Sequence, residues 1–439
     1  MAVIDITTEY YQISLILILA AFAIPIARKV SVAEIPILIV LGILFGPVLG
    51  IVQTGFAVNF MNNFGGVGFG LLALVFILYY ESHNISFRVL RRHFWRIISL
   101  DTVGIIITAL VAGLFFSLIT GAPFSVGFLF GAIVSPTDPV TLIPLFRRMR
   151  IKEDISGTLV GESLFNDPLG IILVTIAIVL VAPSSNYVAL FSVFAHYVGF
   201  AGGIASFFLL QITVPSVVGI AIGFTVIYVN KLLNFENFVV GLLLGIVILE
   251  FTFLEAAGIT PFPAVIATGA IVGNFSDKSI FWNRESNFQQ SLAFLLQTVI
   301  FLLLGSQITR GDLFEYALIG FALSLVVIFI ARPASVFAAL GISGRKGRGP
   351  PINNRIRAFF SLTGPRGVVT VVLSTLPYAV GLNTNNQVLI TWGPLISVST
   401  SFVVLFSIVL QTIYLPILSD RLFGASEGSP DEKTPRSNE

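Results

Sequence analysis

Long apolar runs separated by short polar loops dominate the chain from about residue 12 to about residue 418. Such runs are typical of transmembrane helices, because about 20 residues of α-helix cross the hydrocarbon core of a bilayer. The pattern therefore predicts an all-α, multi-pass membrane protein. The thirteen predicted spans cover residues 12–29, 35–52, 65–81, 95–120, 124–147, 157–182, 200–230, 236–254, 261–276, 288–308, 315–337, 355–379 and 390–418.

One stretch, residues 187–230, is long enough for two spans, or for one span preceded by an interfacial helix. The distribution of basic residues favours a single crossing. In that case the loops after odd-numbered spans, together with the span ends that flank them, hold 21 of the 24 Lys and Arg residues, whereas the loops after even-numbered spans hold only Arg310. Because Lys and Arg accumulate on the cytoplasmic side, the sequence predicts an outside N-terminus and a cytoplasmic C-terminus in the plasma membrane.

Composition agrees with this pattern and excludes several classes of protein. The chain is 56% hydrophobic and 10% charged, with a mean hydropathy of +0.97, whereas soluble domains carry about 25% charged residues. It has no cysteine, so disulfides, thiolate metal sites and cysteine catalysis are excluded. No Walker motif is present, so we expect gradient-driven transport without a cofactor. Residues 1–423 are predicted to form one membrane domain, followed by a disordered cytoplasmic tail at 424–439.

Two weak internal similarities share nearly the same offset along the chain. EIPILIVLGILFGPV (34–48) matches TPFPAVIATGAIVGN (260–274) in one proline and two glycines, 227 residues later. SPTDPVT (135–141) matches GPRGVVT (364–370), 229 residues later. An offset of seven spans reverses the orientation of the second copy, so we predict two inverted six-helix repeats, as in many transporters. The breaks in spans 5 and 12 are predicted to be unwound helices that line a cavity.

The segment GESLFNDPLG carries four polar side chains within an otherwise apolar span. On a helix, Glu162 shares a face with Asn166, and Ser163 shares a face with Asp167, because each pair is four residues apart. Oxygen-rich clusters of this kind suit a hard monovalent cation, and Asp167 can instead take a proton. The segment therefore predicts one site with two mutually exclusive occupants, carried by Asp167. A purely structural, hydrogen-bonded cluster is the alternative.

The two predicted helix breaks carry further candidates. Asp138 can cap the positive N-terminal end of a half-helix or contribute to the site directly, and these alternatives are nearly balanced. Thr137 can offer its hydroxyl or carbonyl oxygen to an ion. Arg366, at the matching break, is predicted to compensate the carbonyl end of the opposite half-helix, in a structural and not a ligand-binding role.

Arg332 lies inside a predicted span and therefore needs a buried partner. Glu162 is the preferred partner, because an arginine beside Asp167 would permanently neutralise the group that must titrate. Asp101 in span 4 is the alternative. Glu81, at the end of span 3, belongs either to a cytoplasmic funnel or to the membrane interface. Glu250, near the end of span 8, is predicted to be interfacial, with a funnel role as the alternative.

These motifs resemble a known family, the monovalent cation:proton antiporters of the electroneutral, NhaP-like branch. The similarity rests on TDP (137–139), ESLFNDPLG (162–170), ARP (331–333) and GPRG (364–367), in the family's order, and it spans the chain apart from the tail. The resemblance implies thirteen helices, a dimerisation domain and a six-helix core bundle with crossed unwound helices, usually in a homodimer.

The resemblance also implies a role for each matching residue. Asp167 would bind the ion or the proton beside Asn166 and Ser163, with Thr137 and Asp138 completing or bracing the site. The Na⁺ ligands would be Asp167, Ser163 and Thr137.

The resemblance also assigns a structural pair and a stoichiometry. Glu162 would pair with Arg332. Electrogenic relatives carry a second aspartate where Asn166 stands, so the neutral amide fits one cation against one proton. The stretch YYES around Glu81 departs from the family pattern, in which an acidic residue is followed by glycines.

The sequence therefore predicts secondary active, electroneutral exchange of Na⁺, or of Li⁺, for H⁺ by alternating access. A K⁺/H⁺ exchanger of the same fold is the alternative. An intramembrane aspartyl protease with Asp138 and Asp167 as its dyad is disfavoured by Asn166 and by the absence of a GxGD motif, and a titratable carboxylate disfavours a channel. The expected partners are the cation, protons, membrane lipids and a second copy of the chain, with no nucleic acid.

Overall fold

In the computed structural model the chain is nearly all helical, and the described residues contain no strand. The described residues are 6–30, 33–63, 68–85, 87–182, 186–233, 235, 238–276, 280–345 and 353–424. Apart from Gly424, the predicted tail lies outside them.

Each of the thirteen predicted spans coincides with a helix or with successive helical pieces. Eight helices in the described part of the chain are long and apolar enough to cross a membrane. Five further apolar helices have only 10–17 residues, which is shorter than the roughly 20 residues that a complete crossing needs. The multi-pass helical architecture is therefore confirmed, whereas the number thirteen stays a prediction.

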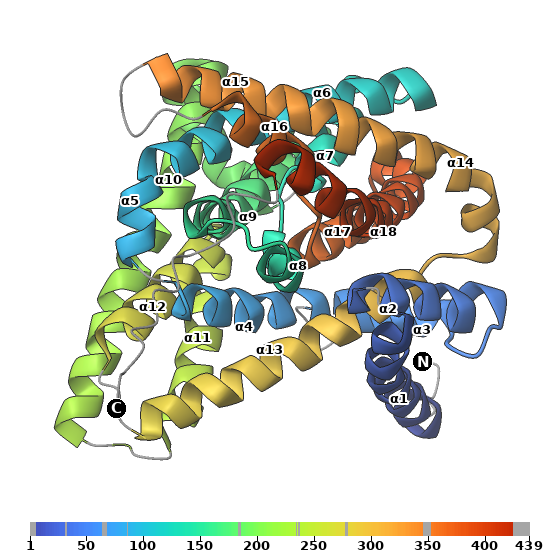
Figure 1. Cartoon of the computed structure of the whole chain (residues 1–439). Helices are drawn as coiled ribbons and strands as arrows, with labels where there is room; N and C mark the ends of the chain where they lie inside the picture. The colour runs from blue at the N-terminus through green and yellow to red at the C-terminus, as the bar shows by residue number, and fades with distance from the viewer. Residues whose placement is uncertain are drawn as a thin grey trace, which may run out of the picture.

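The helices gather into two groups that pack against each other (Figure 1). The first group forms a layer in which α4 and α13 run side by side. Its helices are α1 (Ile6–Val30), α2 (Glu34–Ile43), α3 (Thr54–Asn63), α4 (Phe69–His83), α10 (Asn186–Leu233), α11 (Val239–Ala256), α12 (Phe262–Phe275) and α13 (Ile280–Ser306).

The second group is a bundle around the centrally placed α9 (Figure 1). Its helices are α5 (Phe87–Ser99), α6 (Ile105–Thr120), α7 (Phe124–Ile133), α8 (Ile143–Arg148), α9 (Glu153–Val181), α14 (Arg310–Val326), α15 (Arg332–Arg345), α16 (Asn354–Leu362), α17 (Val368–Thr384) and α18 (Gln387–Phe423). A 3₁₀ turn, η4 (Pro139–Leu142), leads into α8.

Three π-helical turns interrupt helices of the described chain, and two of them are related by the predicted repeat. They are η1 (Leu44–Val48), η3 (Leu100–Gly104) and η6 (Val327–Ala331). From residue 100 to residue 327 the offset is 227 residues, equal to the offset of the first sequence match. This third coincidence supports the duplication, although the repeat itself stays a prediction. π turns are frequent at functional sites, and buried Asp101 and Arg332 lie in and directly after the two related turns.

The long stretch at 187–230 belongs to α10, which is broken at Gly199. This residue has φ 75° and ψ 172°, a conformation that glycine adopts at little cost. A helical piece therefore precedes the one that matches the predicted span at 200–230. This corresponds to the alternative of one span with an additional helix, whose location at the membrane interface is still a prediction.

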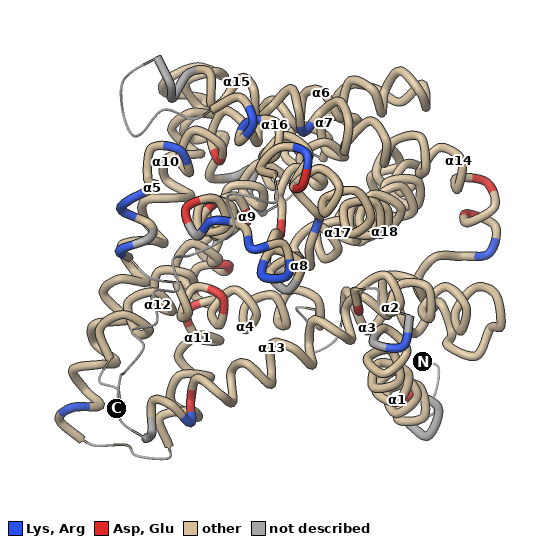
Figure 2. Tube along the Cα trace, viewed as in Figure 1, with Lys and Arg blue, Asp and Glu red and all other residues tan. Residues whose placement is uncertain are grey.

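Two helical segments differ from the hydrophobic pattern. Helix α3 was not predicted, because its ten residues, TGFAVNFMNN, are too few and too polar to give a span signal. Helix α5 begins eight residues before the predicted span at 95–120, because the amphipathic sequence FRVLRRHF contains three arginines that lower its hydropathy. Charged residues otherwise concentrate at helix ends and loops, and a smaller group lies near the centre of the bundle beside α9 and α17 (Figure 2).

Candidate functional site

The two predicted helix breaks meet in the middle of the bundle. Helix α7 ends at Ile133 and helical structure resumes at η4, so residues 135–138 are not helical. Residues 363–367, between α16 and α17, are not helical either. The backbone N–H of Asp138 donates to the carbonyl of Pro365 at 2.8 Å, which joins the two breaks directly. The unwound helices therefore cross at this point.

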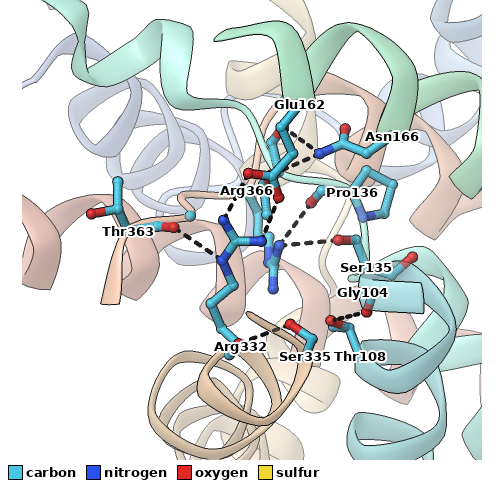
Figure 3. A network of polar contacts seen from close by, with 12 residues as sticks. Gly104, Thr108, Ser135, Pro136, Glu162, Asn166, Arg332, Ser335, Thr363 and Arg366 are labelled. Carbon is cyan, nitrogen blue, oxygen red and sulfur yellow. Dashed lines mark hydrogen bonds and ion pairs between the residues drawn. The ribbon is translucent and has the colours of Figure 1, made fainter. Parts of the chain in front are cut away.

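Each break contributes one charged side chain, which lies beside the end of a helix that borders the other break. The Arg366 guanidinium is buried and donates through Nη1 to the carbonyls of Ser135 and Pro136, both at 3.1 Å, just beyond the C-terminal end of α7 (Figure 3). The Asp138 carboxylate lies against Gly367, the residue that precedes α17. A cation near a helix C-terminus and an anion near a helix N-terminus both stabilise the exposed backbone dipoles. The crossing is thus electrostatically balanced.

Helix α18 supplies hydrogen-bond partners for the break at 363–367. Gln411 Oε1 accepts from the Gly364 N–H at 3.0 Å, and Ser407 Oγ accepts from the Arg366 N–H at 3.0 Å. Tyr414 donates to the Leu362 carbonyl. The sequence interpretation missed these three α18 residues. Their polar side chains at spacings of four and three residues within an apolar helix were the available signal.

The predicted polar face of α9 lies beside this crossing and is buried. Glu162, Ser163, Asn166 and Asp167 are 1–4% exposed. The Asn166 side-chain amide donates to the hydroxyl of Thr137 at 2.7 Å and to its carbonyl at 3.2 Å (Figure 3 shows Asn166). The Asn166 carbonyl oxygen has no hydrogen-bond partner within the described chain. Asn166 therefore fixes Thr137 and leaves one amide oxygen available as a ligand.

Arg332 contacts the α9 face at Glu162. Its Nη1 and Nη2 donate to the two Glu162 oxygens at 2.5 and 3.0 Å, and its Nε donates to the Thr363 carbonyl at 3.0 Å (Figure 3). This bidentate geometry is the strongest form of ion pair between these groups. The alternative partner, Asp101, is buried, and both of its oxygens lack a hydrogen-bond partner in the described chain.

Asp167 differs from Glu162 in having neither an ion pair nor a hydrogen bond among the described residues. Both arginines of the bundle centre are engaged elsewhere, Arg332 by Glu162 and Arg366 by backbone carbonyls. The charged groups that act on Asp167 are the carboxylates of Glu81 and Asp138. Glu81, on α4 of the other helix group, therefore faces the site across the boundary between the two groups. With two further carboxylates acting on it, Asp167 lies in an acidic centre that attracts positive charge.

Close packing at the crossing gives a test of its geometry. A Cβ atom added at Gly367 would lie 2.3 Å from Asp138 Cβ, so Gly367→Ala must displace the Asp138 backbone or the start of α17. We expect destabilisation of about 1–3 kcal/mol, as for other overpacked sites, and a severe loss of transport activity. Gly245→Ala is the matched control, because nothing lies within 4 Å of its added Cβ. Unfolding midpoints and transport assays of both variants check this, and normal behaviour of Gly367→Ala would contradict the observed crossing.

Comparison with known proteins agrees with this architecture. The family model for the transmembrane sodium/hydrogen exchanger matches residues 15–421. The Na⁺/H⁺ antiporter 1 of Methanocaldococcus jannaschii is 30% identical over 434 residues, which cover 94% of this chain and 95% of the relative. The structure of the sodium proton antiporter MjNhaP1 from that organism superposes with a TM-score of 0.82 at 27% identity, covering 96% of this chain and all of the other. The K⁺/H⁺ antiporter NhaP of Alkalimonas amylolytica is 27% identical over 382 residues, covering 84% of this chain and 60% of the relative.

The family match and the similarity to solved and curated antiporters identify an ion-coupled membrane transporter and not an enzyme. The chain belongs to the sodium/hydrogen exchanger family, because the family model covers almost its whole length. The family resemblance noted from the motifs is thereby confirmed, and the class of activity is cation/proton exchange.

Proposed function

We propose that this protein exchanges one Na⁺ for one H⁺ across the membrane, and that Asp167 holds either the cation or the proton but never both. The observation that carries the proposal is the contrast between two acids of one helix. Glu162 is neutralised by bidentate contact with Arg332, whereas Asp167 has no basic partner in the described chain. An ionised carboxylate at such a position is costly unless a positive charge joins it.

The neighbouring residues supply oxygen ligands of the kind that Na⁺ prefers. Ser163 shares a helix face with Asp167, and Thr137 lies on the break that passes α9. The unpaired Asn166 carbonyl oxygen is a further donor. Asp138 braces the crossing or contributes to the site directly, and Arg366 supports the unwound backbone. We infer that Na⁺ binds to Asp167, Ser163 and Thr137, with Asn166 beside them.

A neutral amide at position 166 supports electroneutral exchange. With Glu162 paired, Asp167 is the group of the α9 face that remains to change its protonation state. One carboxylate exchanging one cation for one proton moves no net charge. Glu81 is proposed to belong to the cytoplasmic funnel, because it faces the acidic centre from α4.

Na⁺ is the preferred cation, and K⁺ is the second candidate. The relative with 95% coverage and the solved structure with the TM-score of 0.82 are both named as sodium antiporters. Relatives named K⁺/H⁺ antiporters, at 27–29% identity, keep K⁺ open.

The division into two helix groups supports alternating access. The site lies on the bundle around α9, and Glu81 approaches it from the layer that contains α4. Movement of the bundle against this layer would open the site to each side in turn. We propose that this occurs in a homodimer in the plasma membrane, among membrane lipids, with the N-terminus outside and the C-terminus in the cytoplasm.

Exchange can be measured in proteoliposomes that carry an imposed pH gradient. Added Na⁺ should dissipate the gradient at the same rate with the membrane potential clamped at zero or at a negative value. Li⁺ and K⁺ are tested in parallel, and choline is the inert control. A rate that depends on the membrane potential would contradict electroneutrality, and dissipation by K⁺ but not by Na⁺ would replace the Na⁺ proposal by its alternative.

Asn166→Asp tests whether the amide does more than set the charge. An ionised aspartate cannot donate the two hydrogen bonds that Asn166 makes to Thr137, and it would face the Thr137 oxygens as an acceptor. We therefore expect exchange to fall about 10-fold or more, instead of a simple change to electrogenic transport. Proteoliposome assays at several membrane potentials check this. A fully active, potential-dependent variant would show that the hydrogen bonds to Thr137 are dispensable.

A further inference from the structure

A second group of buried polar side chains lies between α4 and α13, away from the α9 face. Glu285 and Gln289, one turn apart on α13, are 0% and 1% exposed. Tyr79 and His83, one turn apart on α4, face them, and Tyr79 is 0% exposed. Nothing in the exchange of ions at Asp167 requires this group.

The oxygens of this group are poorly satisfied. Both Glu285 oxygens, both polar atoms of the Gln289 amide and the Tyr79 hydroxyl lack a well-formed hydrogen bond in the described chain, although the Tyr79 hydroxyl and the Gln289 amide lie close enough to interact with the Glu285 carboxylate. His83 Nε2 is 3.9 Å from Glu285 Oε2, which is too long for a hydrogen bond. Buried polar atoms normally find partners, so several unpaired oxygens that face each other indicate a ligand.

Among the described residues, the elements packed around Glu285 bring no fixed positive charge to its carboxylate. From α4 come Tyr79 and His83, and from α11 comes Glu250, which acts on Tyr79 and is itself bonded to Thr268 of α12 at 3.0 Å. Arg284 precedes Glu285 on α13 but is exposed. Glu250 is buried against α12, and its predicted location at the membrane interface stays a prediction.

We propose that Glu285 is the centre of a second binding site, separate from Asp167, for a single monovalent positive charge, either a proton or an alkali cation. The carboxylate supplies the charge, and the Gln289 amide oxygen and the Tyr79 hydroxyl supply neutral oxygens around it. Such a set of donors resembles the carboxylate, amide and hydroxyl groups of the α9 site. An ionised Glu285 without an occupant would be a buried, uncompensated charge, which proteins avoid.

The position of this site connects it with the transport site through one helix. Helix α4 presents Tyr79 and His83 to α13, and it presents Glu81 to Asp167. A charge taken up at Glu285 therefore acts on the same helix that lines the acidic centre.

The test uses ligand-linked stability in a background without the transport carboxylate. Full-length Asp167→Asn and Asp167→Asn/Glu285→Gln proteins are purified into lipid nanodiscs, and thermal unfolding midpoints are measured. One arm varies pH from about 5 to about 9 in choline chloride; the other varies Na⁺ at fixed pH and constant ionic strength. A ligand that binds the folded state raises the midpoint in proportion to its occupancy.

The proposal predicts that the difference in midpoint between the two proteins changes by several degrees in one arm. A change in the pH arm identifies a proton, and a change in the Na⁺ arm identifies an alkali cation. A difference that stays constant in both arms would overturn the proposal. It would do so without touching the role of Asp167, which is already removed in both proteins.

Two further variants keep the result interpretable. Asp167→Asn/Glu315→Gln removes an exposed carboxylate of α14 and should show no ligand-linked difference. Asp167→Asn/Glu285→Asp keeps the carboxylate but shortens it, so it should retain the linkage with a displaced midpoint of titration. If the glutamine variant does not fold, the aspartate variant alone is compared with Asp167→Asn. An unfolding midpoint whose dependence on pH and on Na⁺ is the same in both proteins would then overturn the proposal.

Discussion

Asp167→Asn is expected to abolish cation/proton exchange, with a residual rate at least about 100-fold below that of the unmodified protein. The amide keeps the shape of the side chain but cannot take up a proton or balance the charge of a cation. Because Asp167 makes no hydrogen bond or ion pair in the described chain, its replacement should leave the fold intact. Proton flux in proteoliposomes and an unfolding midpoint close to that of the unmodified protein check both parts.

Asp420→Asn is the matched control for this experiment, because Asp420 is an exposed aspartate near the end of α18. It should exchange ions at the normal rate. If Asp167→Asn protein is well folded and still exchanges cations for protons, another group must bind the cation and the proton. Asp138 and Glu81 are then the remaining acids of the centre.

Arg332→Ala is expected to produce the largest loss of stability, about 3–5 kcal/mol. The substitution leaves Glu162 as a buried carboxylate without its partner and removes the donor to the Thr363 carbonyl. The loss should therefore be one of folding, with cation affinity nearly unchanged in whatever protein folds. Denaturant unfolding in detergent and cation titration of the folded fraction separate these two effects.

Two comparisons make the Arg332 prediction specific. Arg310→Ala removes an exposed arginine at the start of α14 and should change stability by less than about 0.5 kcal/mol. Combining Arg332→Ala with Glu162→Gln removes both charges, so the double variant should be less destabilised than the sum of the single variants. Additive losses, or a large affinity defect in a well-folded Arg332→Ala protein, would argue against a structural pair.

The hydrophobic pattern was sufficient to predict the helical membrane fold. In lipid, every span must be apolar outside and must hydrogen-bond its own backbone, and an α-helix meets both requirements. The pattern was insufficient where a helix is short or amphipathic, as in α3 and at the start of α5. Proline and glycine marked both helix breaks, and the offset of the two matches predicted that they are related. The contact between the two breaks could not be predicted. It joins Asp138 and Pro365, which are more than 200 positions apart, and local sequence patterns do not encode such contacts.

Part of the candidate site could also be predicted from the sequence, and part could not. The spacing of polar residues on α9 is a local property, so the buried face with Glu162 and Asp167 could be predicted from the sequence. Because a buried arginine needs an acidic partner, the sequence limited the partner of Arg332 to Glu162 or Asp101. In the structure Arg332 contacts Glu162. The partners of the unwound backbone on α18, such as Gln411, could not be assigned, because single polar residues in an apolar helix do not reveal which neighbour they face.

The central claim is that one carboxyl group, that of Asp167, holds a cation and a proton in turn. It is tested most directly by measuring proton release from purified, weakly buffered protein when Na⁺ is added, together with the amount of Na⁺ bound. The account predicts about one proton released for each cation bound, and neither binding nor release at this site in Asp167→Asn. Cation binding without proton release, or equal proton release from Asp167→Asn, would contradict it.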